Sequence, residues 1–304
     1  MNEKLSGFEH YPDEGTIDAW IDGIWREGQA IEFEAELLTE LEPGLTVNVR
    51  HLKGHHYVRF SPQGMDPFYG YWQPTLSRPA PLLVHTPGYG AEISIHPDLV
   101  MQGYNVLHVN PLGYVTPSGA DETKLRDESW PVFDDTFESG AKQGYRQWLI
   151  NCVLAIKWAQ SREEVIPGRV SFFGTSQGGG AALLLGSIYQ GRGTRCVAAD
   201  EPFMVNFPLC QVIPADWWSD SFDKISADVW RALGFIDALS HARRLTVPVM
   251  LTGGEKDPSC PAATIESLFE QLPATRMYCY LHGQEHDYNQ EFIALAAAWF
   301  RLYA

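Results

Sequence analysis

The sequence predicts an α/β fold in which a mainly parallel central sheet carries helices on both faces and antiparallel strands at its N-terminal edge. Three observations support this prediction. Short apolar runs alternate with helical patterns from residue 81 to the C-terminus. Over residues 31–37, and in part over 47–50, apolar and polar side chains alternate instead, which is typical of strands with one solvated face. A strand, a tight turn and a helix also follow one another around Ser176.

The N-terminal part of the chain is expected to form a helix and then the antiparallel strands. Trp20, Ile21, Ile24 and Trp25 lie at helical spacing, so we expect an N-terminal helical extension over residues 1–30 that lies on the body. The edge strands are expected at residues 31–37, 47–50, 57–60 and 68–72.

The remaining chain alternates strands with helices, which favours a parallel sheet. The expected parallel strands cover residues 81–85, 103–109, 170–173, 195–200, 247–252 and 276–281. Apolar residues at helical spacing predict helices over 145–156 and 292–303. We find no linker, repeat or low-complexity stretch. We therefore expect a single α/β domain over residues 1–304, with a substrate-side insertion over 203–240.

The segment around Ser176 predicts a nucleophile. Residues 174–178 read Gly-Thr-Ser-Gln-Gly and match the pattern G-x-S-x-G. The apolar run 170–173 precedes them and the small-residue run 179–185 follows, which is the strand–turn–helix setting of a nucleophile elbow. The two glycines of the pattern have no Cβ, so the strand and the helix can approach closely there. Such a turn holds the serine hydroxyl clear of the sheet.

A serine hydroxyl becomes a nucleophile when a base takes its proton and an acid orients that base. On a sheet of this kind the three residues follow in the chain order serine, acid, histidine. Asp257 is the expected acid, because it lies in the turn-rich loop that follows strand 247–252. Glu255 in the same loop and Asp200 at the end of an earlier strand are the competing carboxylates.

The expected base lies in the loop after strand 276–281, which contains both His282 and His286. We favour His286, because it lies deeper in the loop and has room to turn back over Ser176. Acid and base then each follow the end of a strand, where a parallel sheet gathers its site.

Composition argues against several kinds of partner. The 304 residues carry a formal net charge of −16, which disfavours nucleic acid and anionic membranes. The N-terminus has no apolar signal core, no apolar run is long enough to span a bilayer, and the five cysteines are scattered. These features predict a cytoplasmic protein with reduced thiols. Neighbouring His55 and His56 point to opposite faces of a strand, so no metal site is expected there.

Several segments resemble the acetyl xylan esterase and cephalosporin C deacetylase group of α/β-hydrolases, best over residues 144–290. Residues 174–180, Gly-Thr-Ser-Gln-Gly-Gly-Gly, are similar to the Ser-Gln-Gly-Gly elbow of that family. The acid loop 254–261, Gly-Glu-Lys-Asp-Pro-Ser-Cys-Pro, is similar down to its Cys-Pro. Residues 201–203 and 235–239 resemble the family's Pro-Phe stretch and its Tyr-Phe-Asp segment.

This resemblance implies an α/β-hydrolase fold with a catalytic triad of Ser176, Asp257 and His286. It also implies an oxyanion hole formed by the backbone N–H groups of Tyr89 and Gln177, and a reaction that needs neither metal nor organic cofactor. The expected activity is that of a serine esterase acting on a small-molecule ester. Its substrates would be short-chain, acetyl esters, such as acetylated sugars or xylo-oligosaccharides.

Two departures from the family pattern bear on assembly and substrate. The family's Arg-Gly-Gln motif, which is associated with a hexamer, is absent, and residues 110–114 read Asn-Pro-Leu-Gly-Tyr. The family's Gly-His-Glu is replaced by Gln-Glu-His-Asp over 284–287. Because of these departures, three points stay open: whether the protein forms a homo-oligomer, which alcohol the substrate carries, and whether His282 or His286 is the base.

Aromatic residues between the elbow and the acid loop are candidates for substrate binding. We select Phe203, Trp217 and Trp218, because an aromatic wall can stack on a sugar ring or close on a small acyl group. The alternative activities are those of a general carboxylesterase or a peptidase-like α/β-hydrolase, followed by a non-catalytic binding protein on the same fold. A peptidase of the prolyl-oligopeptidase type would be expected to carry a large extra domain, for which 304 residues leave no room.

Overall fold

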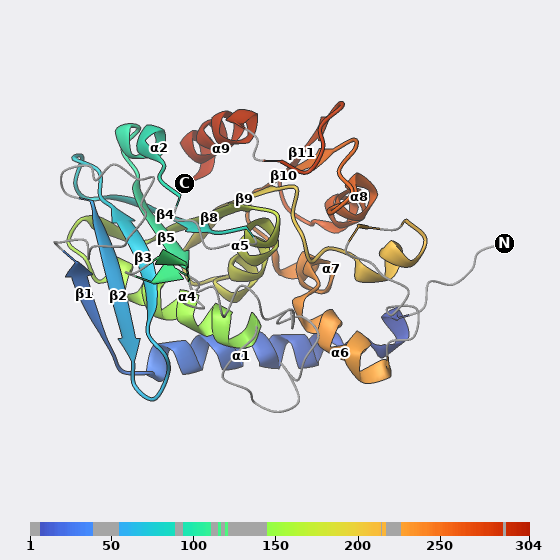
Figure 1. The fold of residues 1–304 in the computed structure, drawn as a ribbon, viewed down its shortest axis with the longest axis horizontal. Helices are drawn as coiled ribbons and strands as arrows, with labels where there is room; N and C mark the ends of the chain where they lie inside the picture. Colours follow the sequence, from blue (N-terminus) through green and yellow to red (C-terminus); the bar gives the residue numbers. More distant parts are fainter. Residues whose placement is uncertain are drawn as a thin grey trace.

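The structure is a computed structural model, and it describes residues 7–38, 55–88, 94–110, 115–116, 119–120, 145–213, 215–216, 226–287 and 290–304. A nine-stranded sheet runs through the middle of these residues, and helices lie on both of its faces (Figure 1). This is the predicted α/β architecture. The edge strand expected over 47–50 lies outside the described residues.

The sheet has an antiparallel part and a parallel part. In spatial order its strands are β1 (Phe33–Leu38), β2 (His56–Pro62), β3 (Phe68–Gln73), β5 (Asn105–Asn110), β4 (Ala80–Thr86), β8 (Val165–Thr175), β9 (Thr194–Asp200), β10 (Val249–Gly254) and β11 (Arg276–Leu281). The pairs from β1 to β5 are antiparallel, and the pairs from β5 to β11 are parallel. A separate antiparallel pair is formed by β6 (Val115–Thr116) and β7 (Gly119–Ala120). The predicted antiparallel N-terminal edge is therefore confirmed.

The helices are divided between the two faces of the sheet. They are α1 (Glu14–Ala30), α2 (Pro97–Met101), α4 (Tyr145–Gln160), α5 (Gln177–Ile188), α6 (Ala227–Ile236), α7 (Ala238–His241), α8 (Ala262–Gln271) and α9 (Gln290–Tyr303), with short 3-10 turns η1 (Phe8–His10), η2 (Phe207–Gln211) and η4 (Ala242–Arg244). Helices α1, α4 and α5 share one core with every second strand residue, such as Leu82 and Val84. Leu83 between them points into the other core, under α2 and α9. Figure 1 shows α2 and α9 on the side of the sheet opposite to α1 and α4.

The N-terminal helical extension expected over residues 1–30 contains α1, which covers residues 14–30. This helix starts at Glu14 because Asp13 caps it, accepting a hydrogen bond of 2.7 Å from the backbone N–H of Thr16. Helix α1 lies directly on α4 at Gly28, where an added Cβ would come within 2.5 Å of Cγ1 of Val153. Among the described residues before the helix, Phe8–His10 form the short turn η1.

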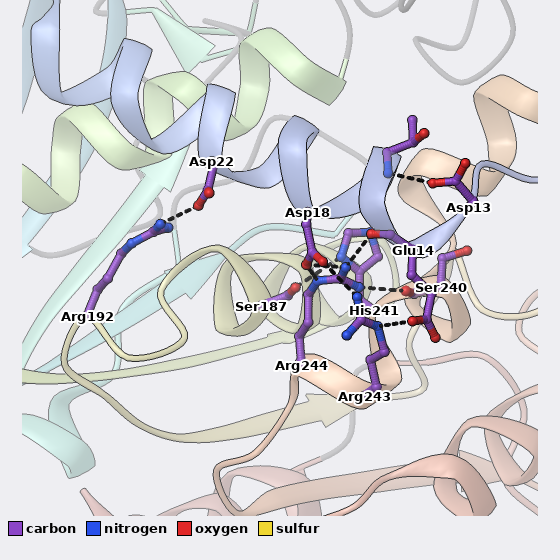
Figure 2. Close-up of polar contacts among 11 residues, drawn as sticks. Asp13, Glu14, Asp18, Asp22, Ser187, Arg192, Ser240, His241, Arg243 and Arg244 are labelled. Carbon is purple, nitrogen blue, oxygen red and sulfur yellow. Dashed lines mark hydrogen bonds and ion pairs between the residues drawn. The ribbon is translucent and has the colours of Figure 1, made fainter.

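Ion pairs join the outer side of α1 to distant parts of the chain. Asp18 pairs with both Arg243 and Arg244, and Asp22 pairs with Arg192 (Figure 2). Only 4% of the Arg244 side chain is exposed, whereas 53% of the Asp18 side chain is, so the pair lies at the edge of the body with its acidic partner in solvent. The helix thus closes one core of the body and does not stand apart from it.

Candidate active site

The strand–turn–helix unit from which a nucleophile elbow was predicted is present, with Ser176 in the turn between β8 and α5. Strand β8 ends at Thr175, Ser176 has φ 57° and ψ −122°, and α5 begins at Gln177. A positive φ is unfavourable for a residue with a side chain, so the surrounding structure must hold this turn. The backbone N–H of Ser176 donates to the carbonyl of Asp200 (2.9 Å), and the carbonyl of Ser176 accepts from the N–H of Phe203 (2.9 Å).

Close backbone contacts explain the two glycines of the elbow. A Cβ on Gly178 would lie 2.1 Å from the carbonyl oxygen of Thr86, and a Cβ on Gly174 would lie 2.6 Å from the same oxygen. Thr86 also donates a side-chain hydrogen bond of 2.7 Å to the carbonyl of Gly178. The end of β4 therefore packs directly onto the turn, and any side chain at either glycine would separate them.

Three loops at the carboxyl edge of the sheet bring a serine, a histidine and an aspartate together. Nε2 of His286 lies 3.0 Å from Oγ of Ser176, and Nδ1 of His286 lies 2.8 Å from Oδ2 of Asp257. The other carboxylate oxygen of Asp257 accepts the backbone N–H groups of Ser259 and Cys260, each at 2.8 Å. Those two bonds leave Oδ2 directed at the imidazole.

The electrostatic environment favours the charged form of His286. Burial alone lowers the pKa of His286, but the hydrogen bond and the negative charge of Asp257 outweigh that effect and raise the pKa above its ordinary value of 6.5. An imidazole with this pKa accepts a proton readily from a hydroxyl 3.0 Å away.

The competing residues lie elsewhere. The side chain of His282 is 83% exposed, and its nearest carboxylate is that of Glu255, 3.7 Å away. Glu255 also accepts the backbone N–H of Gly283, so it braces the outer part of the loop. Asp200 is buried and accepts hydrogen bonds from the hydroxyls of Thr175 and Thr252. Of the two histidines and three acids considered from the sequence, His286 and Asp257 are the ones hydrogen-bonded in line with Ser176.

Backbone donors lie close to the serine. Gln177 is the first residue of α5, and the first N–H groups of a helix have no partner within it, so its N–H is available for a bound oxygen. On the other side, a Cβ on Gly88 would lie 3.9 Å from Cβ of Ser176. Tyr89, which follows Gly88 and was expected to supply the second donor, lies outside the described residues.

The predicted aromatic residues are only partly placed. Trp217 and Trp218 lie outside the described residues. Phe203 is 6% exposed and packs edge-on against Phe207 within the main core. Trp230, also in this region, is 5% exposed and covers Gly7. These side chains contribute to the core, and a contact of Phe203 with substrate stays a prediction.

One group of possible metal ligands is present among the described residues, and it overlaps this site. Ligand atoms of Asp257, Cys260 and His286 lie within 4.8 Å of one another. Both imidazole nitrogens of His286 already face hydrogen-bond partners. Burial raises the pKa of the Cys260 thiol well above its ordinary value, which opposes the thiolate that a metal would need. The set therefore fits a hydrogen-bonded triad better than a metal centre.

A further carboxyl group lies next to the triad and was not recognised from the sequence as a site residue. Oε2 of Glu201 lies 3.6 Å from Nδ1 of His286, and the residue has no exposed surface. Burial, followed by the charges of Asp257 and Asp200, raises the pKa of Glu201 to about 8. The signal available in the sequence was the position of this residue. Glu201 is an acidic residue directly after β9, and β9 is the neighbour of β8, the strand that leads into Ser176.

The site and fold agree with comparisons to known proteins. A family model described as acetyl xylan esterase (AXE1) matches residues 56–302. The chain belongs to this family. The acetyl xylan esterase family assignment and the described fold make it an esterase of the α/β-hydrolase type, a carboxylic ester hydrolase.

Solved structures show the same fold over nearly the whole chain. Acetyl xylan esterase 1 from Thermoanaerobacterium sp. JW/SL YS485 has a TM-score of 0.74 and 17% identity, covering 95% of this chain and 93% of that one. Acetyl xylan esterase from Paenibacillus sp. R4 has a TM-score of 0.71 and 19% identity, covering all of both chains. Acylaminoacyl peptidase from Pyrococcus horikoshii has a TM-score of 0.57 and 13% identity, and the match covers 90% of this chain but 41% of that one.

Within the part of the chain that the structure describes, no helix combines the length and the apolar character needed to cross a membrane.

Proposed function

We propose that this member of the acetyl xylan esterase family hydrolyses short-chain, acetyl esters of sugars or xylo-oligosaccharides through an acyl-enzyme formed on Ser176. The observation that carries the proposal is the continuous hydrogen-bonded line from Ser176 through His286 to Asp257 at the carboxyl edge of the sheet. The names of the two acetyl xylan esterases with the same fold support the acetyl group as the acyl half.

In the first half-reaction, Nε2 of His286 takes the proton from Oγ of Ser176 as that oxygen attacks the ester carbonyl. Asp257 holds the Nδ1–H of the imidazole and stabilises the imidazolium that forms. The tetrahedral oxyanion is stabilised by the backbone N–H of Gln177 and by that of Tyr89. Each such donor contributes on the order of a hundredfold or more to the rate.

Collapse of the tetrahedral intermediate breaks the bond to the alcohol, and His286 returns its proton to the leaving oxygen. A water molecule then takes the place of the alcohol. His286 removes a proton from that water as it attacks the acetyl-enzyme. The second intermediate then releases acetate by breaking its bond to Oγ of Ser176, and His286 returns the proton to that oxygen.

The nucleophile is tested with Ser176→Ala, measured on p-nitrophenyl acetate and by labelling with a fluorophosphonate probe. We expect kcat to fall by ~10⁴- to 10⁶-fold and labelling to disappear, with the fold retained. Near-wild-type turnover in a folded Ser176→Ala protein would overturn the proposal.

The chain supplies a matched control for this experiment. Ser187 lies on the same helix α5, and its hydroxyl is 3.1 Å from Nδ1 of His241, so it forms a second buried serine–histidine pair (Figure 2). Ser187→Ala removes an equivalent contact away from the elbow. It is expected to keep both the labelling and the esterase activity.

A further inference from the structure

Glu201 occupies a constrained position directly after β9. Its φ of 39° is in the positive region, and its backbone N–H donates a hydrogen bond of 3.1 Å to Oγ1 of Thr252. The side chain is completely buried. A Cβ on Gly254 would lie 2.7 Å from Oε1 of Glu201, so the carboxyl group fills space that is free because residue 254 is glycine.

The carboxyl group of Glu201 is directed at the catalytic imidazole. Its Oε2 lies 3.6 Å from Nδ1 of His286, the same nitrogen that lies 2.8 Å from Oδ2 of Asp257. Neither oxygen of Glu201 has a hydrogen bond of normal geometry to any residue that the structure describes. A buried polar group in this situation is costly, so a position that keeps one beside a catalytic nitrogen calls for a functional explanation.

The groups around Glu201 determine its charge. Those that act on it are Asp200 at the end of β9, Asp257 and Cys260 in the loop after β10, and His286 and Asp287 in the loop after β11. Burial and the two aspartates raise the pKa of Glu201 to about 8, while His286 and the backbone N–H of Asp287 act in the opposite direction. At neutral pH the group is therefore mainly a neutral acid, and loss of the Asp257 charge would lower its pKa.

We propose that Glu201 is a second acid for His286, a positioning residue that shares Nδ1 with Asp257 and takes over the orientation of the imidazole when the carboxylate of Asp257 is removed. The inference rests on the proposed function of the triad. Takeover requires the Oε2–Nδ1 distance to close from 3.6 Å to the 2.8 Å that Asp257 now has. The proton on Nδ1 then has a carboxylate acceptor again, and the base keeps the tautomer that leaves Nε2 free for Ser176.

Two substitutions of Asp257 separate this idea from a simple loss of the acid. In Asp257→Asn, the amide oxygen is expected to keep the N–H bonds of Ser259 and Cys260, so the NH₂ group faces Nδ1. That donor forces the wrong tautomer of His286. In Asp257→Ala no donor competes, and the carboxyl group of Glu201 has room to approach.

We therefore expect an unusual order of activities on p-nitrophenyl acetate. Asp257→Ala should retain at least tenfold more kcat than Asp257→Asn, and adding Glu201→Gln to Asp257→Ala should remove that advantage. As a single substitution, with Asp257 present, Glu201→Gln should lower kcat only a few fold at pH 7. Adding Glu255→Gln to Asp257→Ala is the control, because Glu255 faces His282 and not His286.

A spectroscopic readout keeps the test independent of turnover. The Nδ1 proton of His286 should give a strongly downfield proton resonance in Asp257→Ala that disappears in the Asp257→Ala, Glu201→Gln double variant. Thermal unfolding checks that each variant is folded. Equal activities of the single and double variants, or the same proton spectrum for both, would overturn the role of Glu201. If Ser176→Ala is instead fully active, the proposed function itself is wrong.

Discussion

The side chain of Gln177 donates a hydrogen bond to the hydroxyl of Tyr145, which connects the first residue of α5 to the first residue of α4. Both residues are buried. The contact holds the residue whose backbone N–H is proposed to stabilise the oxyanion. Through this bond, a helix without a residue in the triad helps to fix the position of the elbow.

The first prediction concerns this contact. Tyr145→Phe removes the hydroxyl and leaves the Gln177 amide without that acceptor, so the N–H of Gln177 loses part of its alignment. We expect kcat to fall about tenfold with little change in KM, which is less than the ~10²-fold cost of removing an oxyanion donor itself. Steady-state kinetics on p-nitrophenyl acetate measure both constants. A rise in KM with unchanged kcat would show that the pair serves substrate binding instead.

The second prediction distinguishes the two histidines of the loop. His286→Ala should reduce kcat by about as much as Ser176→Ala, because members of a triad act as a unit. His282→Ala should reduce it by less than about threefold, since that side chain is 83% exposed and faces Glu255. The comparison uses the same ester under the same conditions. Reversed effects would place His282 in the catalytic machinery.

The third prediction concerns pH. His286 must be neutral to accept the proton of Ser176, so activity is lost as pH falls through its pKa. The hydrogen bond and the charge of Asp257 raise that pKa above 6.5 against the effect of burial. We therefore expect the acid limb of kcat/KM to have its midpoint above pH 6.5, measured from pH 5 to 9. A midpoint below 6.5 would show that burial dominates over the carboxylates.

The fourth prediction tests the packing of the elbow. Gly178→Ala places a Cβ against the backbone of Thr86, which cannot move aside as a side chain can. We expect it to lower the free energy of unfolding by on the order of 3 kcal/mol. Gly23→Ala is the matched control, because a Cβ on this α1 residue meets nothing within 4 Å. It should raise the free energy of unfolding by about 1 kcal/mol. Urea unfolding measures the free energy of unfolding of both variants. Similar changes in the two variants would contradict the prediction.

The fifth prediction concerns the acyl group. If the enzyme is built for acetyl esters, kcat/KM should fall along the series of p-nitrophenyl acetate, propionate, butyrate and octanoate. In an open apolar tunnel, each added methylene could instead contribute ~0.8 kcal/mol to binding. Rates that increase with chain length would therefore indicate a general carboxylesterase.

Much of this molecule can be predicted from local patterns. The alternation of apolar and polar side chains indicates which strands have one solvated face. The end of β11 is indicated by the six-residue run at 276–281 and the turn-rich loop that follows it. The elbow is predictable because Gly174 and Gly178 are required by contacts within one strand–turn–helix unit and its neighbouring strand. These features depend on backbone geometry, which nearby residues largely control.

Other features depend on how distant loops meet, and no local pattern reports that. His282 and His286 are four residues apart in one loop, yet one is exposed and the other bonds to Ser176. The sequence marks Phe203 as an aromatic residue close to the site, but its burial in the main core, with 6% of its surface exposed, follows only from the tertiary structure. Glu201 is 85 residues from His286 in the chain, and its relation to Nδ1 arises only when β9 and the loop after β11 lie side by side. Periodicity specifies which face of an element is buried, whereas long-range packing selects which side chains share a buried space.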